Sequence, residues 1–136
     1  LGARERSNLP ILIAEDSPLL SHLIQDCLKR AGYSNLIVNM DGQEAWDKLE
    51  AFAKEGTLAE NVKLVITDIE MPKMDGHHLT KLIKSNGKTS FLPVIIFSSM
   101  ISEDMMRKGK SLGADAQITK PEIGTLVGEI DRLILK

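Results

Sequence analysis

The sequence predicts an α/β domain in which a parallel sheet carries helices on both faces. Five short apolar runs alternate with five segments whose apolar residues recur every three or four positions. The short runs are typical of strands buried on both faces, and the longer segments are typical of amphipathic helices. Strands that alternate with helices imply right-handed crossovers and therefore parallel strands. Polar residues that follow the apolar runs should then gather at one edge of the sheet.

Each apolar run predicts one strand. The expected strands are residues 10–14, 36–38, 64–67, 93–97 and 114–118. The last of these is more polar than the others, which suits an edge of the sheet. Residues 1–8 are polar and aperiodic, and we interpret them as a linker or tail ahead of one domain at residues 9–136.

The helices are marked by their caps and their apolar faces. Ser17 followed by Pro18 predicts an N-cap and a first helical residue, and Gly32 predicts the end of that helix. Its expected apolar face consists of Leu19, Leu20, Leu23, Ile24, Cys27, Leu28 and Ala31. Further helices are expected from Asp41 to about Ala53, after Gly76 to about Asn86, from Ser102 to Leu112, and from Ile123 to Ile134. We interpret His77 and His78 as solvent-exposed, because neighbouring residues of a helix do not share a face.

Composition limits the classes of function. The chain of 136 residues fits one domain, and Cys27 is its sole cysteine, which excludes an internal disulfide and a cysteine metal site. The net charge is −2, without the Lys and Arg cluster that nucleic-acid binding needs. No apolar run approaches the roughly 20 residues of a membrane span, and no signal peptide is visible. We therefore expect a cytoplasmic domain that binds neither nucleic acid nor membrane.

Charged and hydroxyl residues follow four of the five strands. Glu15 and Asp16 follow the first strand, Asp68 the third, Ser98 the fourth and Lys120 the fifth. Clustered carboxylates repel one another and raise their own pKa values, so positive charge must offset them. Mg²⁺ binds carboxylate, water and phosphate oxygens, and the ammonium of Lys120 suits a phosphoryl oxygen. Together these groups predict phosphoryl transfer with a carboxylate nucleophile.

The same residues carry a resemblance to a known family. Asp68 with Met71-Pro72-Lys73-Met74-Asp75-Gly76, preceded by Glu15-Asp16 and followed by Ser98 and Lys120-Pro121, resembles the receiver domain of two-component response regulators. The resemblance spans the chain from about Leu9 to its end. It implies a doubly wound, flavodoxin-like (βα)5 fold with strand order 2-1-3-4-5.

The resemblance also implies roles for single residues. Asp68 would accept a phosphoryl group from the phosphohistidine of a histidine kinase, and Lys120 and Ser98 would contact that group. Mg²⁺ would be held by Glu15, Asp16, Asp68 and the backbone carbonyl of Glu70. The peptide bond between Lys120 and Pro121 is expected to be cis.

Three residues depart from the family pattern. Gln117 stands where many receivers carry an aromatic residue that changes rotamer together with the hydroxyl residue, here Ser98. Ser98 replaces the commoner threonine and keeps the hydroxyl. Glu15 replaces the commoner aspartate and should still reach a metal directly or through water.

The chain also resembles the receiver half of chemotaxis coupling proteins of the CheV kind, in which a CheW-like domain precedes the receiver. The resemblance lies in residues 67–72, with the sequence Thr-Asp-Ile-Glu-Met-Pro, and in residues 120–126, with the sequence Lys-Pro-Glu-Ile-Gly-Thr-Leu. That resemblance implies a role in signalling by the chemoreceptor–kinase complex, or service as a phosphate sink. Phosphorylation would switch a protein-binding surface formed by the fourth helix, fifth strand and fifth helix.

Two other classes of function are open to test. An aspartyl-phosphate phosphohydrolase would use Glu70, two residues after Asp68, as a second acid, and activity on external substrates would identify it. A flavodoxin-like cofactor binder shares the sheet order, but the chain lacks a phosphate-binding loop after the first strand.

Overall fold

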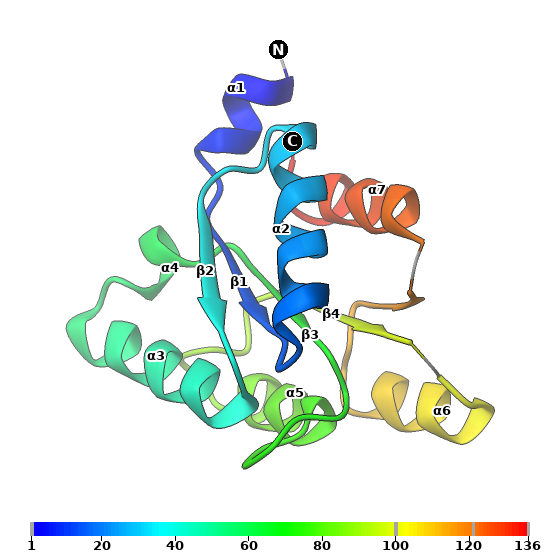
Figure 1. Ribbon diagram of the computed structural model, residues 1–136. Coiled ribbons are helices and arrows are strands. Elements are labelled where there is room, and N and C mark those ends of the chain that lie inside the picture. Colours follow the sequence, from blue (N-terminus) through cyan, green and yellow to red (C-terminus); the bar gives the residue numbers. More distant parts are fainter. Residues whose placement is uncertain (1, 100, 121, 136) are drawn as a thin grey trace.

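A parallel sheet forms the centre of the computed structural model, with five strands in the order β2-β1-β3-β4-β5 (Figure 1). The structure describes residues 2–99, 101–120 and 122–135. The strands are β1 (Ile11–Ala14), β2 (Leu36–Asn39), β3 (Leu64–Thr67), β4 (Val94–Ser98) and β5 (Ala116–Thr119). The helices are α1 (Gly2–Ser7), α2 (Pro18–Ala31), α3 (Gly42–Glu55), α4 (Leu58–Asn61), α5 (Gly76–Ser85), α6 (Glu103–Ser111) and α7 (Ile123–Ile134). The predicted doubly wound fold is confirmed.

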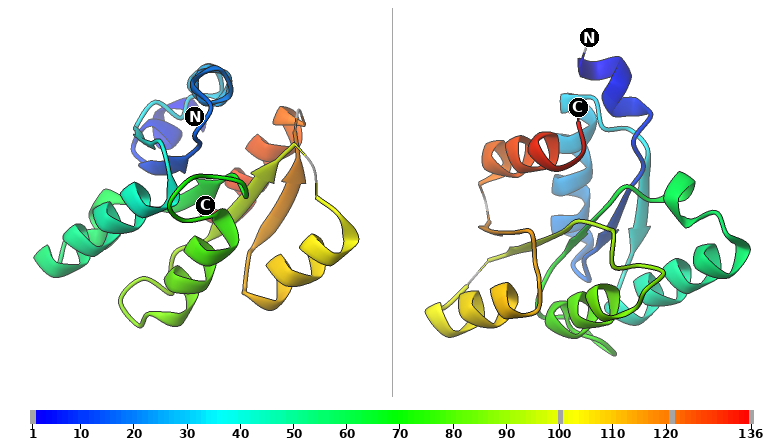
Figure 2. Two further views of the ribbon diagram at one scale, coloured as in Figure 1. Left: turned by 60° about the horizontal axis from the view of Figure 1, so that its bottom comes forward. Right: turned by 180° about the vertical axis from the view of Figure 1, so that it is seen from behind.

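Apolar clusters lie on both faces of the sheet, because successive strand residues point to opposite sides. On one face α2 and α7 pack against side chains that include Ile13, Ile66 and Phe97. On the other face α3, α4 and α5 pack against a set that includes Leu12 and Val65 (Figures 1 and 2). Among the described residues, α6 contributes to neither cluster. Within the same ranges, no helix has the length and apolar character needed to cross a bilayer.

Five helices begin at the edge where the strands end, namely α2, α3, α5, α6 and α7, and all of them except α7 begin with a side-chain cap. The hydroxyl of Ser17 accepts a hydrogen bond from the Leu20 amide at 3.3 Å, as the sequence predicted for the start of α2. The other three caps are Asp41 for α3, Asp75 for α5 and Ser102 for α6. These caps fix where the chain turns back at the end of the sheet that carries the predicted site.

The buried face of α2 is narrower than the sequence predicted. Leu19 and Leu23 are 71% and 47% exposed, and Cys27 is half-buried, whereas Ile24 and Leu28 are buried. The prediction that Leu19 and Leu23 face the core is therefore wrong. The apolar residues of α2 cover a wider arc of the helix than the part that contacts the sheet and α7.

Two short helices lie where the sequence predicted no regular structure. Residues Leu58–Asn61 form α4 in the connection before β3, and Gly2–Ser7 form α1. Arg6 donates to the Oδ2 atom of Asp131 in α7 at 2.6 Å. The buried Tyr33 hydroxyl donates to the Oδ1 atom of the same carboxylate at 2.5 Å. This Arg6–Asp131–Tyr33 cluster attaches the start of the chain to its last helix; a linker role for residues 1–8 stays a prediction.

His77 is buried, which corrects the prediction that both adjacent histidines are solvated. Its side chain is 5% exposed, and its Nε2 atom has no hydrogen-bond partner among the described residues. His78, the next residue, is exposed. Burial lowers the pKa of His77, and the nearby positive charge of Lys108 lowers it further, against an opposing effect of Asp75.

The lowered pKa of His77 predicts a loss of stability in mild acid. The unfolded chain binds a proton as the pH falls below about 6.5, while the folded chain keeps His77 neutral to lower pH. The unfolded state therefore binds more protons, and the free energy of unfolding falls with the pH. We expect the melting temperature of His77→Gln to fall less than that of the wild type between about pH 7 and pH 5.5. Parallel curves for the two proteins would contradict this, and His78→Gln is the matched control.

Candidate functional site

The predicted site residues lie together at one edge of the sheet. Asp68 continues β3, and its amide donates to the Ala14 carbonyl at 3.0 Å. Lys120 continues β5, and its amide donates to the Ser98 carbonyl at 2.8 Å. Because the strand pairs are in register at Ala14 with Thr67 and at Ser98 with Thr119, the residues that follow them stand side by side.

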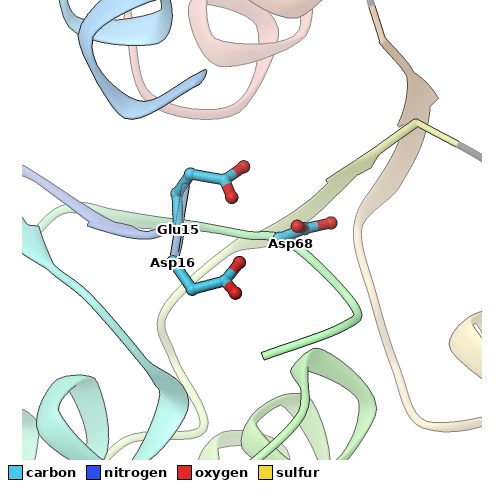
Figure 3. A group of neighbouring side chains, drawn as sticks. All are labelled: Glu15, Asp16 and Asp68. Atoms are coloured by element: carbon cyan, nitrogen blue, oxygen red, sulfur yellow. The ribbon is translucent and has the colours of Figure 1, made fainter. Parts of the chain in front are cut away.

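Three carboxylates converge at this edge. Glu15, Asp16 and Asp68 each offer one oxygen, and these oxygens lie within 4.8 Å of one another (Figure 3). Their surroundings differ, since Glu15 is buried, Asp68 is half-buried and Asp16 is exposed. Clustered oxygens of this kind are the ligands that Mg²⁺ prefers, so the donor set fits a hard divalent cation.

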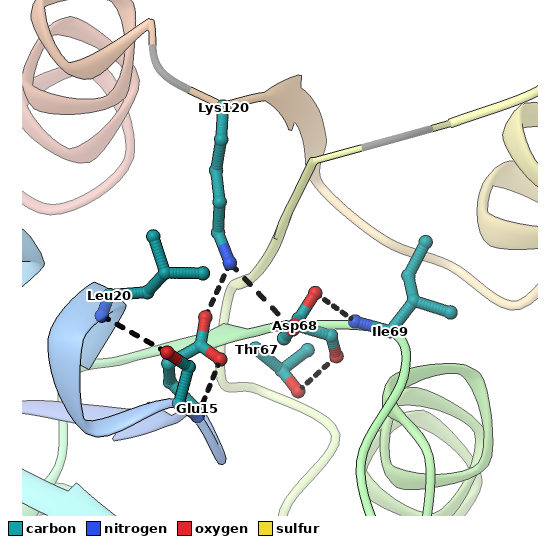
Figure 4. A network of polar contacts seen from close by, with 7 residues as sticks. Glu15, Leu20, Thr67, Asp68, Ile69 and Lys120 are labelled. Carbon is teal, nitrogen blue, oxygen red and sulfur yellow. Dashed lines mark hydrogen bonds and ion pairs between the residues drawn. The ribbon is translucent and has the colours of Figure 1, made fainter.

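Lys120 brings positive charge into the acidic group. Its Nζ atom forms an ion pair with the Oε1 atom of Glu15 and lies 3.7 Å from the Oδ2 atom of Asp68 (Figure 4). The side chains of Lys120 and Glu15 are only 8% and 1% exposed. The ammonium therefore offsets part of the repulsion between the carboxylates in a poorly solvated place.

Glu15 is held at both carboxylate oxygens. Oε1 faces Lys120, and Oε2 accepts a hydrogen bond from the Ser17 amide at 3.1 Å. Burial raises the pKa of Glu15, while the contacts with Lys120 and Ser17 act in the opposite direction. In this arrangement Lys120 is the nearest charged partner of Glu15.

Asp68 is positioned by its own turn. Its Oδ1 atom accepts from the Ile69 amide at 2.8 Å, and the Thr67 hydroxyl donates to its backbone carbonyl at 2.8 Å. Gly76 begins α5 directly against this carbonyl, where an added Cβ atom would collide with the oxygen. The absence of a side chain at Gly76 therefore lets α5 approach the backbone of Asp68.

A cavity of about 630 Å³ opens beside these groups. Its lining residues are Glu15, Asp16, Ser17, Leu20, Asp68, Glu70, Met71, Ser98, Ser99 and Met105. Ser98 and Glu70, which the sequence placed at the site, border this cavity, and their roles there stay predictions. Ser99 and Met105 were not predicted: Ser99 could have been found from its place beside Ser98, whereas nothing in the local sequence marks Met105. The predicted cis peptide at Pro121 lies outside the described residues.

Residues 11–131 match the response regulator receiver domain family. The chain belongs to this family. The resemblance inferred from the Asp68 motif is thereby confirmed, and the strand order agrees with it. The roles of the individual site residues in this receiver domain stay predictions.

Curated relatives of this receiver domain include chemotaxis proteins. It is 30% identical to the chemotaxis protein CheV3 of Helicobacter pylori over 135 residues, which are 98% of this chain and 43% of CheV3. It is 35% identical to the gliding motility regulatory protein of Myxococcus xanthus over 127 residues, which are 92% of this chain and 15% of that protein. The receiver domain therefore spans less than half the length of these two relatives.

Solved structures of receivers have the same fold. The receiver domain of a signal transduction histidine kinase from Syntrophus aciditrophicus is 30% identical, with a TM-score of 0.77, over 91% of this chain and 88% of that chain. The CheX–CheY–BeF3–Mg complex from Borrelia burgdorferi matches at 25% identity and a TM-score of 0.79, over 94% of this chain and 90% of that chain. A Mn²⁺-bound form of the response regulator Rcp1 matches at 26% identity and a TM-score of 0.78, over 94% and 96% of the two chains.

Proposed function

We propose that this receiver domain takes a phosphoryl group from the phosphohistidine of a histidine kinase onto Asp68, in a reaction that requires Mg²⁺. The observation that carries the proposal is the group of three carboxylates beside one buried ammonium, that of Lys120. A structural cluster of polar residues would not need an open cavity next to it, whereas a phosphoryl acceptor does.

The chemistry follows from the positions of the side chains. A carboxylate oxygen of Asp68 attacks phosphorus, the P–N bond of the phosphohistidine breaks, and the imidazole leaves as a neutral ring after taking a proton from solvent. Lys120, at 3.7 Å from Asp68, is placed to contact an oxygen of the transferred group, and Ser98 offers a hydroxyl from the cavity wall. When bound, Mg²⁺ would neutralise part of the charge on that group.

The metal would be held by Asp16 and Asp68, with Glu15 and the backbone carbonyl of Glu70 in reach of the same cavity. Asp16 is the most exposed of the three acids, and Glu15 is engaged by Lys120 and Ser17. These contacts favour Asp16 and Asp68 as direct ligands of the metal. Glu15 would instead hold the ammonium of Lys120 in place through their ion pair.

The proposed setting is cytoplasmic chemotaxis signalling. Similarity to CheV3 over 98% of this chain supports a role beside a chemoreceptor–kinase complex, with a CheW-like domain on the longer protein. Phosphorylation would switch a protein-binding surface, or the domain would serve as a phosphate sink. Family membership favours both roles over a phosphohydrolase that uses Glu70 on external substrates.

Intact-mass measurement after incubation with a small phosphodonor tests the proposal. We expect a single phosphoryl adduct in the presence of Mg²⁺ and none once a chelator removes the metal. Without the metal, the negative charge of the three carboxylates repels the negatively charged phosphoryl group. Asp16→Asn should need a much higher Mg²⁺ concentration, whereas Asp26→Asn, an exposed acid of α2, should behave as the wild type. If neither the small donor nor a phosphorylated histidine kinase gives an adduct on the folded domain, the proposal fails.

A further inference from the structure

Thr67, the last residue of β3, is a buried hydroxyl residue directly before the proposed acceptor. Val65, two residues earlier, belongs to the apolar cluster beneath α5, so the side chain of Thr67 points to the same face of the sheet. Its hydroxyl donates to the backbone carbonyl of Asp68 at 2.8 Å (Figure 4). Within the described ranges, this is the one hydrogen bond that the Asp68 carbonyl accepts.

The carbonyl of Asp68 and the amide of Ile69 belong to one peptide unit, which is planar and rigid. Thr67 holds the oxygen of this unit, and the N–H of the same unit donates to the Oδ1 atom of the Asp68 carboxylate at 2.8 Å. Because the carbonyl and the N–H of a trans peptide unit point in opposite directions, a hydrogen bond at one end fixes the direction of the other. The Thr67 hydroxyl therefore determines where the amide that holds the carboxylate points.

The start of α5 packs against the same peptide unit. An added Cβ atom at Gly76 would lie 1.9 Å from the Asp68 carbonyl oxygen, and the Gly76 amide donates to the Ile69 carbonyl at 2.8 Å. This packing leaves little room for a different donor to the Asp68 oxygen. Loss of the Thr67 hydroxyl would therefore leave that oxygen unsatisfied and allow the peptide unit to rotate.

The two oxygens of the Asp68 carboxylate have different surroundings as a result. Oδ1 is held by the Ile69 amide, whereas Oδ2 lies 3.7 Å from the Nζ atom of Lys120. The amide thus sets the plane of the carboxylate before a phosphodonor arrives, and Oδ2 is left to attack. The rate of a transfer reaction depends steeply on the position of the attacking atom, so a rotated carboxylate would react more slowly.

We propose that Thr67 is a positioning residue for phosphoryl transfer, because its buried hydroxyl fixes the peptide unit that orients the Asp68 carboxylate. The kinetic part of this proposal rests on the proposed function of the acidic site. Thr67 is not among the residues that line the acidic cavity, so its effect on the reaction passes through Asp68 and Ile69.

Hydrogen exchange of the Ile69 amide tests the structural part without any phosphodonor. Thr67→Val removes the hydroxyl and keeps the branched shape, whereas Thr67→Ser keeps the hydroxyl. The matched control is Thr89→Val, since Thr89 is also buried and donates to the Ile83 carbonyl at 2.7 Å, in the connection that leads into the far end of β4. We expect the Ile69 amide to exchange about threefold to tenfold faster in Thr67→Val, the factor that one net hydrogen bond accounts for. Thr67→Ser and Thr89→Val should exchange at the wild-type rate.

The rate of adduct formation with a small phosphodonor at saturating Mg²⁺ tests the kinetic part. We expect the maximal rate of Thr67→Val to fall about tenfold, while the donor concentration at half-maximal rate changes by less than about twofold. Thr67→Ser should restore the maximal rate. Thr89→Val should lose stability by a similar mechanism and keep the wild-type rate, which a merely structural role of Thr67 would not produce.

The outcomes separate the two parts of the proposal. Wild-type exchange of the Ile69 amide in Thr67→Val would overturn it, whatever the rate of adduct formation. Faster exchange with an unchanged maximal rate, or an equal loss of rate in Thr89→Val, would overturn the kinetic part. If Thr67→Val does not fold, Thr67→Ala and Thr67→Ser give the same comparison, because they differ only in the hydroxyl. A wild type that forms no adduct would refute the proposed function and the kinetic part with it, and the Ile69 exchange would still decide whether Thr67 fixes the peptide unit.

Discussion

Asp68→Asn is expected to abolish the phosphoryl adduct and to leave the stability of the fold nearly unchanged. The amide of asparagine is not a nucleophile toward phosphorus, so the adduct should fall below detection in the intact-mass measurement. The asparagine keeps an oxygen that can accept from the Ile69 amide, as the Oδ1 atom of Asp68 does at 2.8 Å. Removal of one of three clustered carboxylate charges relieves repulsion, while Lys120 keeps its ion pair with Glu15.

We therefore expect the free energy of unfolding of Asp68→Asn to lie within about 1 kcal/mol of the wild-type value. Thermal unfolding and intact mass measured on the same samples separate the two effects. An adduct of normal yield in Asp68→Asn would mean that a residue other than Asp68 is the acceptor, and peptide mapping would then locate that residue. A large fall in melting temperature would mean that the Asp68 carboxylate stabilises the fold rather than crowding the site.

Lys120→Met is expected to destabilise the fold strongly. The variant leaves the carboxylate of Glu15, which is only 1% exposed, without its ion-pair partner. Breaking one side of a buried ion pair costs about 3–5 kcal/mol, because the remaining charge stays desolvated. Denaturant unfolding at neutral pH measures this loss. The Asp68 acceptor is intact, so some adduct should still form if the variant folds.

A second substitution provides the control for Lys120→Met. The double variant with Glu15→Gln and Lys120→Met removes both charges, so we expect it to be more stable than Lys120→Met alone. Acid should have a similar effect: without Lys120 the pKa of Glu15 rises further, the folded state binds a proton that the unfolded state lacks, and stability increases as the pH falls toward 5. Arg107→Met, which breaks an exposed ion pair with Asp104, should change little. Equal stability of the single and double variants would refute this account.

The sequence contains enough information to place the site because strand ends are easy to recognise. Apolar runs mark the buried strands, and in a parallel sheet the residues that follow the strands share one edge. The sequence alone therefore predicted one common location for five residues, namely Glu15, Asp16, Asp68, Ser98 and Lys120. The cap at Ser17 likewise depends on local chemistry, and it is present. Predictions that require only the order of the strands along the chain and the local helix caps were therefore accurate.

Predictions that depend on how helices meet were less accurate. Leu19 and Leu23 have the spacing of a core face, but the neighbouring α7 covers only part of that face. His77 is polar and lies beside the exposed His78, and its burial results from the packing of α5 near α6. Gln117 of β5 contacts Gly109 of α6, which joins two elements through a missing side chain, and no periodic pattern in the sequence reveals this contact.

The Arg6–Asp131–Tyr33 cluster affects how a neighbouring domain could be tethered. It ties α1 to α7 at the end of the sheet where β1 begins, and the end of α7 lies on the same side of the molecule as α1 (Figure 1). The acidic cavity lies at the opposite end of the strands, beyond Ala14 and Thr67. A domain joined ahead of Gly2 would therefore be attached at the end of the sheet opposite to Asp68. Such a domain would not lie between Asp68 and an approaching phosphodonor.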